Sequence, residues 1–126
     1  MTIKIAIEPQ SYPEYEQAVR DAGGVPGVIE KDVTALIWTD YTKPDELDVM
    51  LSENPQINWV QLPFAGVDAF ASVIKRPIKF TSAKGSYREP VAEHALALTL
   101  ALMRIIPERV RAKTWGRRYA QTLYRS

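Results

Sequence analysis

The chain has 126 residues, of which 46% are hydrophobic and 25% are charged, and its formal net charge is +1. These values describe an ordinary soluble globular protein and favour one domain over two. Cysteine is absent and histidine occurs once, which excludes disulfide bonds, thiolate nucleophiles and a multi-histidine metal site, so we expect no bound metal. The first apolar run is too short for a signal peptide and is interrupted by Glu8, so we expect a cytoplasmic protein.

Charge is distributed unevenly along the chain. From Arg104 onward the net charge is +6, whereas the preceding residues carry −5. Such an asymmetry can mark an arm that binds nucleic acid or a membrane. No aromatic stacking face or nucleic-acid motif accompanies the basic residues, and cations near a helix C-terminus are ordinary. We therefore expect neither nucleic acid nor a membrane as a partner.

The chain opens with a predicted strand and helix. Residues 3–7 alternate apolar and polar side chains, a pattern that predicts a strand. Ser11, followed three residues later by Glu14, is typical of a capping box, and Pro13 suits the first helical turn. Apolar residues at helical spacing continue to the glycine pair at residues 23 and 24, which predicts the end of the helix.

Strand and helix patterns then alternate along the chain. Further strands are predicted at residues 25–29, 35–38, 59–62 and 78–81. A helix capped by Thr42 is predicted before the fourth strand, another helix opens at residues 66–68, and a long helix begins at Pro90. Alternating strands and helices imply parallel pairing through right-handed crossovers. We therefore predict the α/β class, with a flavodoxin-like, doubly wound parallel sheet of about five strands.

The last helix contains an unusual apolar run from Ala95 to Met103, in which Thr99 is the one polar residue. The run is too short to cross a bilayer, so we predict a helix that is buried on all sides. Because one small sheet covers only one side of it, we expect a homodimer formed through this run. Pro107 should kink the helix or end its first half.

The turn after the fourth strand, which contains Ala65 and Gly66, is the first candidate site. Ligands of doubly wound sheets bind beyond the carboxyl ends of the strands, and the N–H groups of these two residues could hold a carboxylate. The alternative is a turn in which Gly66 serves only the backbone geometry. In the loop before the last helix, Tyr87 and Arg88 could reach a polar ligand, although surface loops often carry such residues without a binding role.

Three segments together resemble the N-terminal part of the D-isomer-specific 2-hydroxyacid dehydrogenases. They are the strand at residues 58–62, the turn Ala-Gly-Val-Asp at 65–68 and the segment Pro-Val-Ala-Glu-His that begins at residue 90. Members of that family are NAD- or NADP-dependent oxidoreductases that interconvert 2-keto acids and D-2-hydroxy acids. The resemblance covers essentially the whole chain. It implies a substrate-binding lobe over residues 1–89. Over residues 90–126 it implies an interdomain crossing helix and a basic tail that lead to a nucleotide-binding domain absent here.

The resemblance also implies roles for single residues. The N–H groups of Ala65 and Gly66 would bind the substrate carboxylate, Phe64 and Tyr87 would line the pocket, and Val91 would lie near the nicotinamide. The family's glycine-rich fingerprint, catalytic arginine, supporting acid and catalytic histidine follow the crossing helix, and none of them occurs here. We therefore expect no catalytic residue in this chain, no reductase activity from it alone, and NAD or NADP only in a longer protein.

Two other interpretations remain open. One is a stand-alone flavodoxin-like module that binds a small molecule or anion at the Gly66 turn, without a nucleotide lobe elsewhere in the gene. The other is an interaction protein that binds nucleic acid through its basic tail, which predicts steeply salt-dependent binding.

Overall fold

The chain divides into two compact units, Met1–Gly85 and Ser86–Ser126. The computed structural model describes residues 2–116. The sequence placed the corresponding boundary after residue 89. None of the described helices is long and apolar enough to pass through a membrane.

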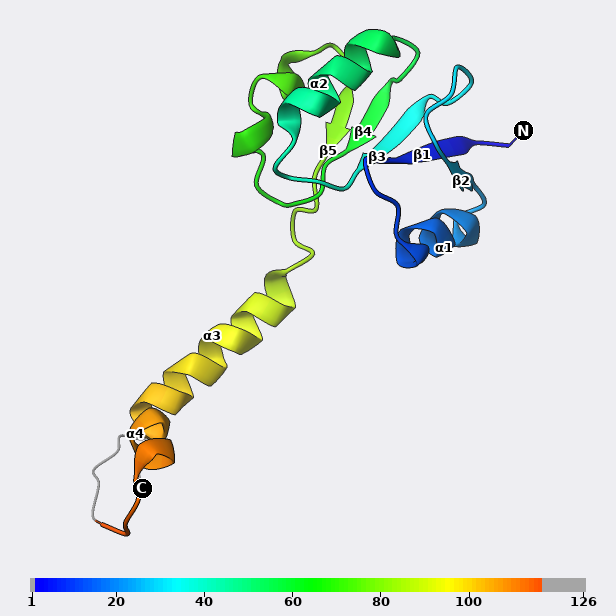
Figure 1. Cartoon of the computed structure of the whole chain (residues 1–126). Coiled ribbons are helices and arrows are strands. Elements are labelled where there is room, and N and C mark those ends of the chain that lie inside the picture. The colour runs from blue at the N-terminus through cyan, green and yellow to red at the C-terminus, as the bar shows by residue number, and fades with distance from the viewer. Residues whose placement is uncertain (1, 117–126) are drawn as a thin grey trace. The chain divides into compact units, whose positions relative to one another are not determined.

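The first unit contains a five-stranded sheet in which all strands are parallel (Figure 1). Its strands are β1 Lys4–Glu8, β2 Val25–Gly27, β3 Ala35–Trp38, β4 Trp59–Gln61 and β5 Lys79–Thr81. Their spatial order is β2-β1-β3-β4-β5. The α/β class and the parallel five-stranded sheet are thus confirmed, and the order is consistent with a flavodoxin-like fold.

Two helices accompany the sheet, α1 Pro13–Asp21 and α2 Pro44–Glu53. The chain leaves β1 toward one edge of the sheet and β3 toward the other, so right-handed crossovers place α1 and α2 on opposite faces (Figure 1). The predicted end of the first helix is confirmed, because Gly23 follows it with a left-handed φ of 90°.

Both predicted helix caps were wrong. The N-cap of α1 is Tyr12, which makes no capping hydrogen bond, and the Ser11 hydroxyl instead donates to Glu16 Oε1 at 3.0 Å. The N-cap of α2 is Lys43, which makes no capping hydrogen bond, and the Thr42 hydroxyl donates to Asp40 Oδ1 at 2.6 Å. In both cases the helix begins one residue later than predicted, and the hydroxyl bonds a side-chain carboxylate instead of capping the helix.

The helix predicted from residue 66 is replaced by two 3₁₀ helices, η1 Asp68–Phe70 and η2 Val73–Lys75. Phe70 ends η1 and Val73 begins η2, and both side chains are buried. The segment therefore contributes to the core without completing an α-helix.

The core lies between the sheet and α2. Ala6, Leu36 and Val60 form one row across the paired strands, and α2 packs Leu47 and Leu51 on this face. On the other face the paired row of Ile5, Ala35 and Trp59 is more open, since Trp59 is 40% exposed. This asymmetry arises because α1 packs mainly on β2 and β1, at one end of the sheet.

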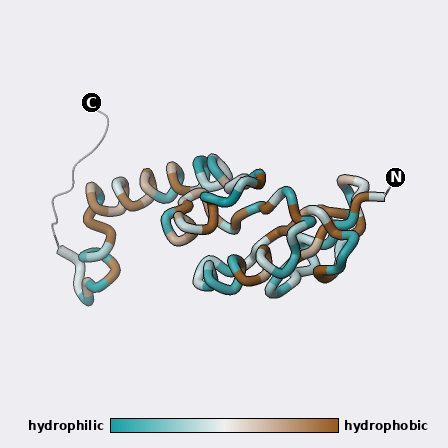
Figure 2. The backbone as a smooth tube through the Cα atoms, turned by 90° about the horizontal axis from the view of Figure 1, so that it is seen from above, coloured by the Kyte–Doolittle hydropathy of each residue, from teal (hydrophilic) through white to brown (hydrophobic). Residues whose placement is uncertain are grey.

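The second unit contains α3 Arg88–Met103 and α4 Ile106–Arg111. Apolar residues recur along α3 (Figure 2), and the hydroxyl of Thr99 donates to the carbonyl of Ala95 at 2.8 Å. Ile105 interrupts the helical backbone with a φ of 48°, and Pro107 lies in the first turn of α4. The expected end of the first helical half is therefore confirmed.

The prediction that the last helix is buried on all sides depends on a partner outside these residues and stays a prediction. None of the side chains of α3 is buried, and Leu102 is 70% exposed. The physical reason is a lack of packing partners, since α4 is the one other helix described in this unit. The helix also begins at Arg88, so Pro90 lies within its first turn.

Candidate functional site

The turn that follows β4 is anchored on both sides. Before it, the N–H of the buried Leu62 donates to the carbonyl of Thr81 at 2.7 Å. Within it, the carbonyl of Phe64 accepts from the N–H of Ala83 at 3.2 Å. These two hydrogen bonds tie the turn to the end of β5 and to the loop beyond it. The turn therefore has a defined position at the carboxyl edge of the sheet.

The central residues of the turn carry two backbone donors that no described residue uses. Ala65 and Gly66 are both exposed. Among the hydrogen bonds between described residues, none has the N–H of Ala65 or Gly66 as donor. Adjacent exposed N–H groups can bind an anion, and a carboxylate accepts such charge-assisted hydrogen bonds strongly. The N–H groups of these two exposed residues are therefore without an acceptor among the described residues.

Gly66 is not required by the turn itself. A Cβ atom built on this residue would meet no heavy atom within 4 Å, and its backbone lies outside the left-handed region. The interpretation that this glycine serves only the backbone geometry therefore finds no support in its φ angle or in crowding. Its absent side chain leaves open space beside the exposed donors.

The loop after β3 adds a side chain that sequence reasoning missed. The ring of Tyr41 lies 5.0 Å from the ring of Phe64, measured between centroids, and the two planes are inclined at 59°. Strands β3 and β4 are parallel neighbours, so the loops that follow them lie at the same edge of the sheet. That adjacency is the signal that could have identified Tyr41.

The same loop holds an ionised carboxylate. Asp40 Oδ1 accepts hydrogen bonds from the Thr42 hydroxyl at 2.6 Å and from the Thr42 N–H at 2.8 Å. These two hydrogen bonds, the hydroxyl's first, lower the pKa of Asp40 from its ordinary value. Lys43 Nζ lies 3.9 Å from the other carboxylate oxygen. Asp40 thus organises this loop beside the turn.

The remaining predicted site residues belong to the second unit. Tyr87 is the N-cap of α3, and its carbonyl accepts from the N–H of Val91 at 3.0 Å. Both side chains are exposed. The expected roles, Tyr87 in the substrate pocket and Val91 near the nicotinamide, stay predictions.

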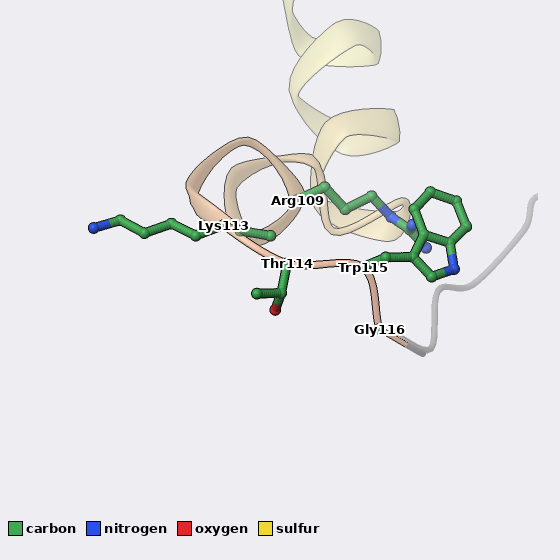
Figure 3. A pocket seen from close by; sticks show the side chains of 6 residues that line it. Arg109, Lys113, Thr114, Trp115 and Gly116 are labelled. Carbon is green, nitrogen blue, oxygen red and sulfur yellow. The ribbon is translucent and has the colours of Figure 1, made fainter.

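A separate cavity of about 300 Å³ lies at the end of α4. Figure 3 shows the Arg109 side chain directed toward the indole of Trp115, whereas Lys113 points away from it. Arg109 Nε donates to the carbonyl of Arg104 at 3.1 Å. No group of acidic, histidine or cysteine side chains within residues 2–116 could hold a metal ion.

Comparison with known proteins identifies no family. No family model matches the chain, and no curated protein matches it. The geometry of the turn and the resemblance of the sequence motifs therefore carry the functional argument.

Proposed function

We propose that this chain is the substrate-binding lobe of an NAD- or NADP-dependent oxidoreductase that interconverts 2-keto acids and D-2-hydroxy acids. The observation that supports the proposal is the pair of exposed N–H groups on Ala65 and Gly66, which bond no acceptor among the described residues. They lie at the carboxyl edge of a parallel sheet, where ligands of this architecture bind. Every 2-keto and 2-hydroxy acid carries the carboxylate that such donors would hold.

The described residues do not fit a nicotinamide dinucleotide. A dinucleotide site needs a glycine-rich turn that follows a strand, whereas Gly23 and Gly24 follow α1. A Cβ at Gly24 would meet Val19 Cγ1 at 3.0 Å, so this glycine serves internal packing. We therefore assign cofactor binding, and the residues that transfer the proton, to a separate domain of a longer protein.

In this proposal the chain's own residues bind and orient the substrate. The N–H groups of Ala65 and Gly66 hold the carboxylate, and Phe64 lies beside it in the same turn. Helix α3 is then the long crossing helix, and its exposed leucines, among them Leu96 and Leu102, would pack on the nucleotide-binding domain or on a second copy of the chain. The roles that the sequence motifs imply, Tyr87 in the substrate pocket and Val91 near the nicotinamide, belong to this proposal.

Backbone amide NMR of the chain, titrated with oxamate, tests the proposal. Oxamate has the carboxylate and adjacent carbonyl of a 2-keto acid and is chemically stable. We expect the largest saturable shifts at the amides of Ala65 and Gly66. Shifts confined to other residues, such as Lys113 and Trp115 of the α4 cavity, would contradict the assignment.

A stand-alone anion-binding module would also bind oxamate at this turn, so a second observation is needed to distinguish it from a dehydrogenase lobe. The coding sequence beyond Ser126 provides that observation. A strand followed by Gly-x-Gly-x-x-Gly within about 30 residues supports the dehydrogenase. A stop codon, or a continuation without that pattern, supports the stand-alone module.

A further inference from the structure

Tyr41 and Phe64 form an aromatic pair next to the exposed donors of the β4 turn. Their ring centroids are 5.0 Å apart and their planes are inclined at 59°. This distance and tilt are within the range in which aromatic rings attract each other. Phe64 directly precedes Ala65 in the chain, and consecutive Cα atoms are about 3.8 Å apart. A ligand held by the N–H of Ala65 therefore has its substituent within reach of this pair.

The backbone around Tyr41 is held before any ligand arrives. Trp38 Nε1 donates to the carbonyl of Asp40 at 2.8 Å, and the Trp38 side chain is fully buried in the core. On the other side of Tyr41, the N–H of Thr42 donates to Asp40 Oδ1 at 2.8 Å. Because both neighbours are fixed, little backbone freedom is lost when Tyr41 contacts a ligand.

Both rings keep much of their surface open. Tyr41 is 56% exposed and Phe64 is 41% exposed. Two large adjacent rings that the core does not use offer apolar surface beside polar donors, which is the usual composition of a small-molecule site. Their surface suits an apolar or aromatic substituent.

The charges of this loop disfavour a second anionic group. Asp40 contacts Lys43 at 3.9 Å, and Lys43 also contacts Glu46 at 4.0 Å. Asp45 adds a further negative charge in the first turn of α2. Lys43 is thus the one cation beside three acidic side chains in residues 40–46, which carry a net charge of −2. A ligand with a second carboxylate or a phosphate would meet repulsion here.

We propose that Tyr41 and Phe64 form the subsite for the substrate's side chain and select 2-keto and 2-hydroxy acids that have one carboxylate and an apolar, preferentially aromatic, side chain. This inference rests on the proposed function, because it places the substrate carboxylate on the N–H groups of Ala65 and Gly66.

The experiment measures dissociation constants by NMR from the Ala65 and Gly66 amide shifts of the 126-residue chain. The probes are D-phenyllactate, D-lactate and D-malate, which present an aromatic, a small and an anionic substituent. We expect D-phenyllactate to bind tightest and D-malate weakest. Tyr41→Ala should weaken D-phenyllactate binding by about two- to tenfold and leave D-lactate unchanged, since aromatic contacts are of this strength.

Two control variants separate ring loss from general damage. Tyr41→Phe keeps the ring and should retain the preference for D-phenyllactate. Tyr15→Ala removes another exposed tyrosine, which pairs edge-on with Tyr12 at 5.5 Å, and should change none of the three constants.

The possible failures are distinguishable. If D-lactate and D-phenyllactate shift the Ala65 and Gly66 amides with equal affinity, or D-malate binds tightest, the inference is overturned and the proposed function stands. Equal weakening of all three probes by Tyr41→Ala would also overturn the selective role of Tyr41. If none of the probes shifts these amides, the proposed function itself fails.

Discussion

Replacement of Gly66 by valine tests whether the turn after β4 binds a carboxylate or only redirects the chain. A Cβ at this residue would meet no heavy atom within 4 Å, and the backbone lies outside the left-handed region. The free protein therefore accommodates the added atoms. A bound carboxylate does not, because the side chain occupies space beside the exposed N–H groups. We expect Gly66→Val to fold normally and to bind oxamate weakly.

Substitution of Gly66 should raise the stability of the fold and lower its affinity for oxamate. At a compatible backbone, the smaller change Gly66→Ala should stabilise the fold by about 0.4–1 kcal/mol, because it restricts the unfolded chain. In a unit of this size that raises Tm by ~2–8 °C. One hydrogen bond to a charged group contributes about 1.5–3 kcal/mol. Loss of one such bond in Gly66→Val should weaken oxamate binding roughly ten- to a hundredfold.

Gly27 provides the matched control. A Cβ there would also meet no heavy atom within 4 Å, and Gly27 lies in β2, at the far edge of the sheet from β4. Gly27→Val should leave oxamate binding unchanged. Calorimetry gives Tm and amide NMR gives the dissociation constant for each variant. The reasoning is refuted if Gly66→Val binds oxamate as tightly as the unmodified chain, or if it unfolds while Gly27→Val does not.

Three further predictions follow from the fold. The 126-residue chain should reduce neither glyoxylate nor pyruvate with NADH or NADPH, and turnover above a blank without protein would contradict this. The exposed apolar side chains of α3 should drive self-association, and Leu102→Glu should favour monomers. Sedimentation of the unmodified chain as a stable monomer at high micromolar concentration would contradict this prediction. Thr42→Val should raise the pKa of Asp40 toward its ordinary value in an NMR titration, because one of two hydrogen bonds to the carboxylate is lost. Folding lowers the pKa of Asp40, so the associated stabilisation is present at pH values above the ordinary pKa and is lost as pH falls through the lowered pKa. An unchanged Asp40 pKa in Thr42→Val would exclude the Thr42 hydroxyl as the cause.

The sheet was predictable because short apolar runs that alternate with helical patterns indicate buried parallel strands. Residues 35–38 were predicted as a strand and form β3 with those bounds. Strand ends were less accurate, since side chains compete for the backbone there. The predicted strand at residues 25–29 stops at Gly27, and the N–H of Ile29 bonds the Glu8 carboxylate at 3.2 Å.

The candidate site was predictable only where it lies in one continuous segment. Phe64, Ala65 and Gly66 are consecutive, so their common position follows from the chain itself. The contact between Tyr41 and Phe64 joins two loops and has no local sequence pattern. Burial of the last helix stays a prediction for a related reason, because it depends on partners that its own apolar residues do not specify.

A crystal structure of the chain grown with oxamate tests the central claim most directly. The account predicts oxamate at the turn after β4, with its carboxylate oxygens about 2.7–3.2 Å from the backbone nitrogens of Ala65 and Gly66. Oxamate bound elsewhere on the chain, with solvent on those two nitrogens, would contradict it.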